Sequence, residues 1–470
     1  MTVKDKIPVI AVFDVGKTNK KLFLFNQQYQ VVFERVARFT ETVDEDGDVC
    51  ENLDSLIHSV FESLREVSNL TDFKLKAINF ATYGASIVYI NEDGKVLTPL
   101  YNYLKTYPED LKKEFYQTYG GETEFASRTA SPVLGSLNSG MQIYRLKKEK
   151  PEIFAQVKYA MHLPQYLSYL ISGKAFTDKT SLGCHSNLWD FKKNDYHTWV
   201  DKENILDKMA PLASSDKVFE APFLGVNYKV GIGLHDSSAA LIPYLVSFKE
   251  PFALLSTGTW CITLNPFNQQ KLKSKELTDD VLCYLQYQGN PVKASRLFSG
   301  YCYEQQIKRI TAHFGTNITD FRNAVFQPEN VSILLEKEEE PNNNNWKQLP
   351  FEKRELADFE NVGLAYHRLM MDLVNQQYHS TQLVMKGTSA KRIFVDGGFS
   401  RNSIFMNLLA LAFPKIEVYA AHMPQATAIG AALAIHDAWN NEPLPNNIIN
   451  LKLYTPAKVF TNKKYSILNI

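Results

Sequence analysis

The chain has 470 residues and 45% of them are hydrophobic, which is enough for more than one core, so two sizeable domains are expected. Basic and acidic residues number 51 each, and the resulting net charge of zero argues against nucleic acid or an anionic membrane as a partner. The five cysteines are widely scattered, which argues against a zinc site and favours a reduced, cytoplasmic protein. The N-terminal apolar run is too short for a signal peptide, and no later run approaches the roughly 18 apolar residues of a membrane span.

The first informative stretch is AVFDVGKTNKKLFLFN, residues 11–26. Gly16-Lys17-Thr18 matches the end of a Walker A phosphate loop, G-x-x-x-x-G-K-[ST], but that loop requires glycine where this chain has Ala11. The loop should also open a helix, whereas a short segment rich in Phe and Leu follows here. The stretch is therefore not a phosphate loop of that kind.

Residues 9–13 and 21–25 are instead predicted to form two strands joined by a tight polar turn. Gly16 lets backbone N–H groups approach an anion, Asp14 could hold a hydrated Mg²⁺, and Thr18 and Asn19 could donate to phosphate oxygens. An ordinary hairpin with polar turn residues explains this stretch equally well.

The stretch VGIGLHDSSAALIPYL, residues 230–245, places Asp236 between a glycine-rich loop and an alanine-rich helical run. Functional carboxylates often occur at such junctions, but capping the helix is the commoner use of aspartate there.

Two further glycine turns follow in the second half of the chain. FALLSTGTWCITLN, residues 252–265, repeats the strand–turn–strand layout with its turn at 257–259. RIFVDGGFSRN, residues 392–402, is predicted as a strand ending on Gly397-Gly398, and a segment of helical periodicity comes after it. Together the three turns predict a duplicated two-domain ATPase that contacts phosphates from both sides.

DVGKTN with Lys21, GLHDSSAA, STGTW and DGGFSRN, in this order, resemble the motifs of the FGGY carbohydrate kinases in the actin-like ATPase superfamily, with the rhamnulokinase and fuculokinase branch closest. The resemblance extends over residues 9–438. It implies an α/β fold with two ribonuclease-H-like domains and a cleft between them. It also implies an N-terminal domain at 1–245 that binds the sugar, a C-terminal nucleotide-binding domain at 246–440 and a tail at 441–470.

The resemblance implies ATP and Mg²⁺ as cofactors, Asp236 as the base that accepts a proton from the sugar hydroxyl, and Asp14 as a metal contact through water. The implied nucleotide and phosphate contacts are Asp14, Gly16, Lys17, Thr18, Asn19, Lys21, Gly258, Thr259, Gln305, Gly397, Gly398, Phe399, Ser400 and Asn402. The implied sugar contacts are Gly84, Tyr101, His235, Asp236 and Ser237.

The chain departs from the family pattern at several of these places. Lys21 stands where arginine is usual, and Lys17 replaces a small residue, so it contacts a phosphate or points to solvent. Tyr103-Leu104-Lys105 replaces an acidic-x-Arg pair, and Leu297 stands where relatives have a sugar-binding Asn. These departures leave the sugar open among L-rhamnulose, L-fuculose, a pentulose and another polyol, and they leave the phosphorylated hydroxyl open as well.

The leading hypothesis is an ATP-dependent kinase of a ketose or related polyol, with ATP and the sugar as its partners. The alternatives are an actin-like ATPase without a sugar substrate, such as a chaperone or filament protein, and a sugar-binding regulator without catalysis. The segment 336–346, acidic and then rich in Asn, is predicted as a solvated loop. The apolar tail at 441–470 is expected to pack across its own domain or against a second subunit, which would make a homodimer.

Overall fold

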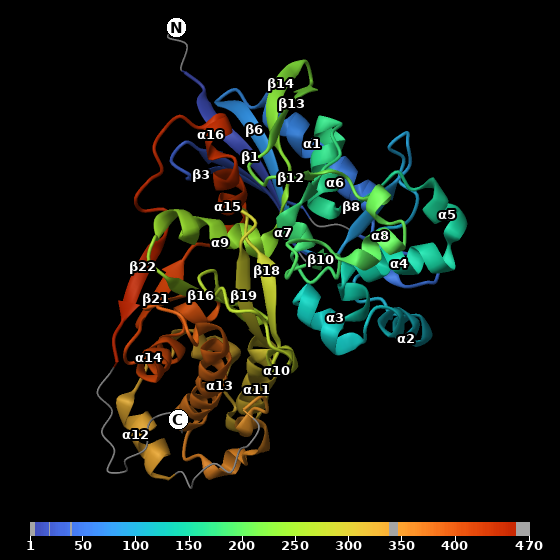
Figure 1. The fold of residues 1–470 in the computed structure, drawn as a ribbon. Coiled ribbons are helices and arrows are strands. Elements are labelled where there is room, and N and C mark those ends of the chain that lie inside the picture. Colours follow the sequence, from blue (N-terminus) through green and yellow to red (C-terminus); the bar gives the residue numbers. More distant parts are fainter. Residues whose placement is uncertain (1–4, 18, 38–39, 338–345, 457–470) are drawn as a thin grey trace.

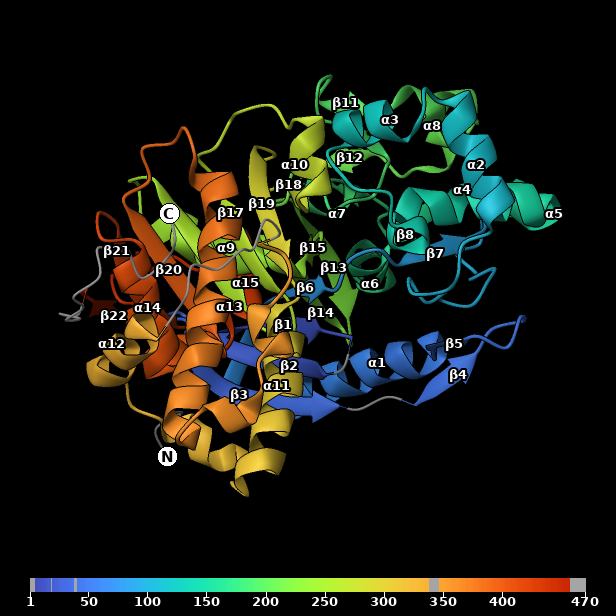
Figure 2. The same cartoon turned by 90° about the horizontal axis from the view of Figure 1, so that it is seen from below.

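The computed structural model describes residues 5–17, 19–37, 40–337 and 346–456. Two large sheets, each with its own helices, lie one above the other, and a mostly helical region lies beside the upper one (Figures 1 and 2). Thr18, most of the predicted loop at 336–346 and the end of the predicted tail lie outside the described residues.

The first sheet is built around β1 (Ile7–Val15), an almost entirely buried apolar strand. It pairs antiparallel with β2 (Lys20–Asn26) and parallel with β6 (Phe73–Thr82), so the predicted first strand pair is confirmed. The strand order is β13-β14-β6-β1-β2-β3, with β15 also on β6. The remaining strands are β3 (Val31–Ala37), β13 (Val218–Phe223), β14 (Val226–Gly231) and β15 (Leu234–His235).

The second sheet repeats this arrangement. Its central strand, β16 (Phe252–Thr257), pairs antiparallel with β17 (Cys261–Asn265) and parallel with β20 (Arg392–Gly397). The order is β18-β19-β17-β16-β20-β21-β22, which confirms the predicted second strand–turn–strand unit. The others are β18 (Val281–Leu285), β19 (Pro291–Leu297), β21 (Glu417–His422) and β22 (Asn450–Tyr454). The edge strand β22 comes from the segment after residue 440, so residues 450–454 of that segment pack on their own half.

Helices cover one face of each sheet. Helices α1 (Leu53–Asn69) and α6 (Leu163–Ser172) share a hydrophobic core with the first sheet. The second sheet packs against helices from its own half, and these bury its apolar side chains on that face. They are α11 (Ser299–Phe314), α12 (Pro328–Glu336), α13 (Val362–Met385) and α14 (Ser403–Ala412).

Two helices, α9 (Asp236–Ser247) and α15 (Ala426–Ala434), lie between the two sheets. Ala239 and Ile242 of α9 belong to the core of the first sheet, whereas Leu241 and Tyr244 belong to that of the second. The alanine-rich α15 packs against α9 so closely that a Cβ at Gly430 would collide with the carbonyl oxygen of Ala239. Helix α15 therefore packs on another helix as well as on the first sheet.

The helical region is inserted in the first half of the chain, and its aromatic core is centred on Phe115, which makes edge-to-face contacts with Tyr144 and Trp199. A hairpin of β4 (Glu41–Val43) and β5 (Val49–Glu51) lies near it. The other α-helices and strands of the first half are β7 (Ile87–Ile90), α2 (Glu109–Thr118), α3 (Glu122–Thr129), α4 (Ser139–Glu149), α5 (Pro151–Gln156), β8 (Tyr159–His162), β9 (Thr177–Asp178), α7 (Lys179–Leu182), β10 (Trp189–Asp190), β11 (Asp195–Tyr196), α8 (Thr198–Lys202) and β12 (Leu212–Ala213). Those of the second half are α10 (Ser274–Thr278) and α16 (His436–Trp439).

Within the described ranges, no helix has both the length and the apolar character needed to cross a lipid bilayer. The five cysteines, all of which are described, are free thiols.

Candidate active site

Asp236 is the first residue of α9, and the N-cap position before it belongs to His235. One carboxylate oxygen of Asp236 accepts hydrogen bonds from the Ser237 N–H at 2.5 Å and from the Ser237 hydroxyl at 3.2 Å. The same oxygen lies 3.1 Å from Nε2 of His235. The side chain is still 33% exposed. The carboxylate is thus oriented through one oxygen and keeps the other for a ligand.

Asp14 approaches Asp236 because of the strand order. In the first sheet, Asp14 of β1 and Leu234 of β15 are both paired with Ala81 of β6, in parallel. The carboxyl ends of these strands meet at one edge, where open α/β sheets bind their ligands. Two acids far apart in sequence become neighbours there.

Burial first and the charge of Asp236 second raise the pKa of Asp14, and Lys21 lowers it, so that the pKa is about 7. A buried carboxylate beside a second carboxylate is stabilised by a cation. Mg²⁺ usually takes one or two carboxylates and fills its other positions with water and substrate phosphates. Asp14 and Asp236 fit such an ion, and the positive charge of the ion would stabilise the ionised carboxylate of Asp14 most.

The first glycine turn is closed by a hydrogen bond from the Gly16 N–H to the Asn19 carbonyl, 2.9 Å long. Lys17, expected on a phosphate or in solvent, instead reaches Glu51, with 3.5 Å between Nζ and Oε1. Lys21, opposite Asp14 in the strand pair, holds Glu34 at 2.8 Å. Of the predicted residues in this turn, Thr18 lies outside the described ones.

The second glycine turn and the loop after β20 are fastened together through Thr257. Its carbonyl accepts the Gly398 N–H at 2.9 Å, and its hydroxyl accepts the Phe399 N–H at 3.0 Å. Gly397 has a φ of 88°, and a Cβ there would collide with the same carbonyl. A glycine is therefore required at 397 by both conformation and space.

A cleft of about 670 Å³ opens between this turn, this loop and helix α11. Its volume lies within the range of small-molecule and cofactor sites. It is lined by Thr257, Gly258, Thr259, Gly300, Tyr303, Glu304, Phe321, Gly398, Phe399, Arg401 and Asn402. The structure thus brings five of the predicted nucleotide contacts together in one cleft.

Two predicted nucleotide residues are next in sequence to residues that line this cleft but do not line it themselves. Ser400 donates to the Gly397 carbonyl at 2.8 Å and so stabilises the loop. Gln305 follows Glu304 on α11 but does not line the cleft. Sequence reasoning missed Gly300, although a signal existed, since a glycine that opens a helix beside a glycine turn indicates close backbone approach. A Cβ at Gly300 would collide with the Gly258 carbonyl.

Gly84, a predicted sugar contact, packs on the imidazole beside Asp236. A Cβ at this position would come within 3.1 Å of the His235 ring and of Sγ of Cys184. Burial lowers the pKa of His235, only partly opposed by Asp236, so the imidazole is neutral near pH 7. Its Nε2 lies 3.1 Å from Sγ of Cys184. A neutral ring has one N–H to donate and one nitrogen to accept, which suits a hydroxyl ligand.

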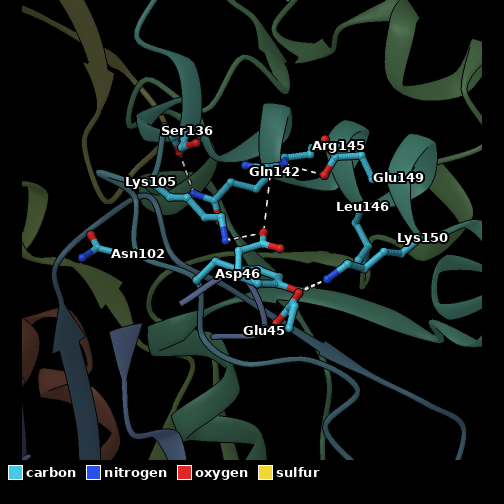
Figure 3. A pocket seen from close by; sticks show the side chains of 11 residues that line it. Glu45, Asp46, Asn102, Lys105, Ser136, Gln142, Arg145, Leu146, Glu149 and Lys150 are labelled. Carbon is cyan, nitrogen blue, oxygen red and sulfur yellow. Dashed lines mark hydrogen bonds and ion pairs between the residues drawn. The ribbon is translucent and has the colours of Figure 1, made fainter. Parts of the chain in front are cut away.

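Tyr101, the remaining predicted sugar contact, lies with a different set of residues. Its hydroxyl bonds to Glu45 and accepts from Lys150 at 3.2 Å, in a small cavity of about 30 Å³ (Figure 3). None of the residues that line this cavity is a neighbour of Asp236 described above.

Comparison with known proteins agrees with this geometry. Residues 9–240 match the N-terminal domain of the FGGY family of carbohydrate kinases, and residues 249–338 match the FGGY carbohydrate kinase C-terminal domain. A rhamnulokinase of Mannheimia succiniciproducens is 22% identical over 448 residues, which cover 90% of this chain and 88% of the relative.

Two solved structures show the same fold. A carbohydrate kinase from Novosphingobium aromaticivorans has a TM-score of 0.78 at 21% identity, over 97% of this chain and 96% of that one. A ligand-bound xylulose kinase from Lactobacillus acidophilus has a TM-score of 0.75 at 16% identity, over 96% and 94% of the two chains.

Proposed function

Because this chain belongs to the FGGY family of carbohydrate kinases, we propose that it transfers the γ-phosphoryl group of ATP to a hydroxyl of a ketose, with Asp236 as general base. The substrate is an L-rhamnulose-like or L-fuculose-like ketose or a pentulose. A relative named rhamnulokinase and a structural neighbour named xylulose kinase support this range.

The proposed role of Asp236 rests on its accessibility and orientation. A sugar hydroxyl is a poor nucleophile at neutral pH, so its proton must leave as the new P–O bond forms. One oxygen of Asp236 is held by Ser237, while a third of the side chain stays open to a ligand. The proton passes from the sugar hydroxyl to this carboxylate, and the neutral His235 holds a neighbouring hydroxyl.

Charge on the phosphates is balanced from both halves of the molecule. The two glycine turns, at Gly16 and Gly258, each follow the central strand of a sheet, the first next to Asp14 and the second in the lining of the nucleotide cleft. When bound, Mg²⁺ neutralises charge on the phosphoryl oxygens, and Asp14 holds it through water.

The observation that carries this proposal is that Asp14 lies beside Asp236 at one edge of the first sheet. Asp236 begins the helix that leads to the second phosphate turn. An acid placed there serves a reaction at the end of a nucleotide bound in the second half.

A coupled assay of ADP release with a panel of ketoses, aldoses and polyols tests the proposal. We expect ADP release to depend on one or a few ketoses and on Mg²⁺. Equal rates with and without every sugar would contradict it and would favour an actin-like ATPase of the chaperone or filament type. A clear preference for an aldose or a linear polyol would keep the kinase and reject the ketose.

A further inference from the structure

The side chain of Lys17 extends away from the first phosphate turn, and its ammonium lies in a group of charged residues. Its Nζ lies 3.5 Å from Oε1 of Glu51, and Nζ of the buried Lys20 lies 3.3 Å from the same oxygen. The ammonium of Lys17 also sits over the rings of Tyr83 and Tyr103, 5.6 and 5.7 Å from their centroids. Cation–π contacts and the carboxylate together fix its position. The side chain remains 26% exposed, so a ligand can still reach it.

This group borders the proposed base. Tyr83 precedes Gly84, which packs on the ring of His235 beside Asp236. Burial raises the pKa of Tyr103, and the charges of Asp236 and Glu51 raise it further, which places this ring near both carboxylates. Lys17 therefore extends from the phosphate turn toward the sugar side of the site.

Glu51 is delivered by the β4–β5 hairpin, of which it is the last residue. The hairpin docks on the segment after β7, where Glu51 bridges to Leu100 and Asn102 donates to the Val49 carbonyl at 3.1 Å. This contact places the carboxylate beneath the ammonium of Lys17.

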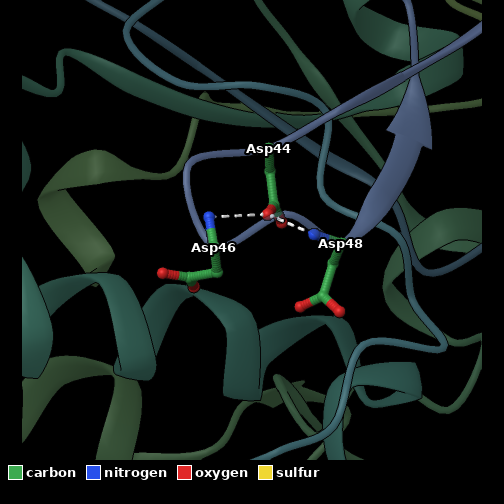
Figure 4. A group of neighbouring side chains, drawn as sticks. All are labelled: Asp44, Asp46 and Asp48. Carbon is green, nitrogen blue, oxygen red and sulfur yellow. Dashed lines mark hydrogen bonds between the residues drawn. The ribbon is translucent and has the colours of Figure 1, made fainter.

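The tip of the hairpin is held by Lys105 in what we call the Asp clasp, formed by Asp44, Asp46 and Asp48 (Figure 4). Nζ of Lys105 lies 2.5, 2.7 and 3.1 Å from the three carboxylates in that order. Asp44 also accepts the N–H groups of Asp46 and Asp48, both at 3.0 Å. Lys105 is thus committed to the hairpin, whereas Lys17 extends toward the sugar side.

Resting on the proposed function, we propose that Lys17 contacts the sugar and determines specificity, and that Glu51 is a positioning residue which holds Lys17 and lowers the positive charge around it. The site then selects a neutral polyhydroxy sugar over a sugar acid. Glu51 shares its carboxylate between Lys17 and Lys20, which weakens the attraction of Lys17 for a substrate carboxylate, while the carboxylate of Asp236 repels it. Discrimination of this kind works through an unfavourable charge for the wrong ligand.

The test compares the wild type with Lys17→Met and Glu51→Gln on the best ketose and on an aldonate of similar length. For Lys17→Met we expect the ketose KM to rise by about tenfold because a hydrogen bond from a charged donor is lost, with the ATP KM within about twofold of wild type. For Glu51→Gln we expect kcat/KM for the aldonate relative to the ketose to rise by about tenfold or more, because the charge of Lys17 becomes available.

Glu203→Gln is the matched control, since Glu203 is also a mostly buried partner of a lysine and a tyrosine, Lys147 and Tyr119, outside the site. It should leave the ratio of aldonate to ketose use unchanged. Should Glu51→Gln fail to fold, as judged by thermal unfolding and ADP binding, Lys17→Met still tests the sugar contact.

Three results would overturn the inference while the kinase stands: a wild type that prefers the aldonate, a Glu51→Gln ratio equal to that of wild type, or a Lys17→Met change confined to the ATP KM. The last result would assign Lys17 to the phosphates instead. If no sugar, neutral or acidic, stimulates the wild type, the proposed function itself fails and the inference fails with it.

Discussion

At the residue scale, the role of Asp236 can be separated from its contribution to structure. Asp236→Asn keeps the shape of the side chain and its bond from the Ser237 N–H, but the amide cannot accept the proton of a sugar hydroxyl. We expect kcat to fall by about 100-fold or more while sugar and ATP binding persist. Steady-state kinetics and calorimetric binding measure both quantities.

Asp54→Asn is the control for this variant, because Asp54 is an exposed acid in the first turn of α1. It should keep wild-type rates. Turnover close to wild type in Asp236→Asn would remove Asp236 from the role of base.

Asp14 makes activity and stability depend on pH in opposite senses. Its carboxyl has a pKa of about 7 in the folded chain against an ordinary 3.8, so between these values the folded state binds the extra proton. Stability without metal therefore falls as pH rises from about 4 to about 7, and this group adds no further change above that. Magnesium binding runs the other way: the Mg²⁺ concentration required rises about tenfold for each unit by which pH falls well below 7, because protons compete with the ion.

Asp14→Asn should remove both dependences. In EDTA its melting temperature should exceed that of wild type at pH 8, and the difference should shrink by pH 5. Asp178, whose pKa burial also raises to about 7, titrates in both proteins, so the difference between them isolates Asp14. Parallel melting curves and overlaid magnesium titrations would show that Asp14 does not hold the metal.

Which residues could be predicted from sequence depended on how local their surroundings are. Gly397 and Gly398 could be predicted because a strand that ends on two glycines has few other uses. The contact between the Lys17 ammonium and Glu51 could not be predicted, because Glu51 lies on a hairpin that carries no recognisable motif. The direction of a flexible lysine side chain depends on which charged residues the tertiary fold places near it. Tyr101 was assigned to the sugar by its place in a motif, whereas Glu45 and Lys150 hold its hydroxyl in another cavity.

At the element scale, the Asp clasp makes the β4–β5 hairpin depend on a single ammonium. Lys105→Met leaves Asp44, whose side chain is buried, beside two other carboxylates. We expect local opening of residues 41–51 to become easier by about 2 kcal/mol, less than for a fully buried pair because Asp46 and Asp48 are half exposed. Hydrogen–deuterium exchange of the hairpin measures this directly.

The pH dependence of this loss has a definite sign. The pKa of Asp44 lies below its usual value: burial raises it, but the bonds from Lys105 and from two backbone N–H groups outweigh burial. The clasp therefore stabilises the fold above the ordinary aspartate pKa and is lost as pH falls through the lower one. The excess exchange of Lys105→Met should persist at neutral pH and shrink as pH falls below the ordinary aspartate pKa of 3.8. Lys158→Met, which breaks an exposed pair with Glu92, should show neither effect.

The central strands β1, β2, β16, β17 and β20 could be predicted because their apolar runs are bounded by glycine turns, a pattern that is local in sequence. The hairpin β4–β5 could not, because four of its six strand residues are exposed, only half of the six are apolar, and the hairpin is held by contacts with distant segments. Predicted turns were correct where the turn residues alone decide the backbone.

At the scale of the whole molecule, the duplication could be read from two strand–turn–strand units, and the sheets repeat the same pairing around β1 and β16. What the sequence did not give was the layer between them. The alanine-rich α15 is in the second half of the chain yet packs on the first sheet, where the side-chain amide of Asn79 donates to the Ala431 carbonyl at 2.7 Å. An alanine-rich helix is expected to pack closely on a neighbour, but its sequence does not show which sheet or helix that neighbour is.

That layer connects the two halves of the proposed site. Asp236 begins α9, and the chain leaves α9 to enter β16 and the second phosphate turn. The crossing of α9 with α15 therefore sets how far the base lies from the nucleotide cleft. Because Gly430 touches the backbone of Ala239, the spacing of the two helices has no room for an extra methyl group.

Gly430→Ala should force α9 and α15 apart, since backbone cannot move aside as a flexible side chain can. We expect a loss of about 1–3 kcal/mol in stability and a fall in kcat of about tenfold or more, with ADP binding nearly unchanged because the cleft lies wholly in the second half. Gly363→Ala is the control, a helical glycine whose added Cβ would meet side chains and no backbone, Asn361 at 3.1 Å and Asn330 at 3.6 Å. If Gly430→Ala lowers the melting temperature but keeps the wild-type kcat, the spacing of these helices is a packing requirement alone and does not align the base with the nucleotide.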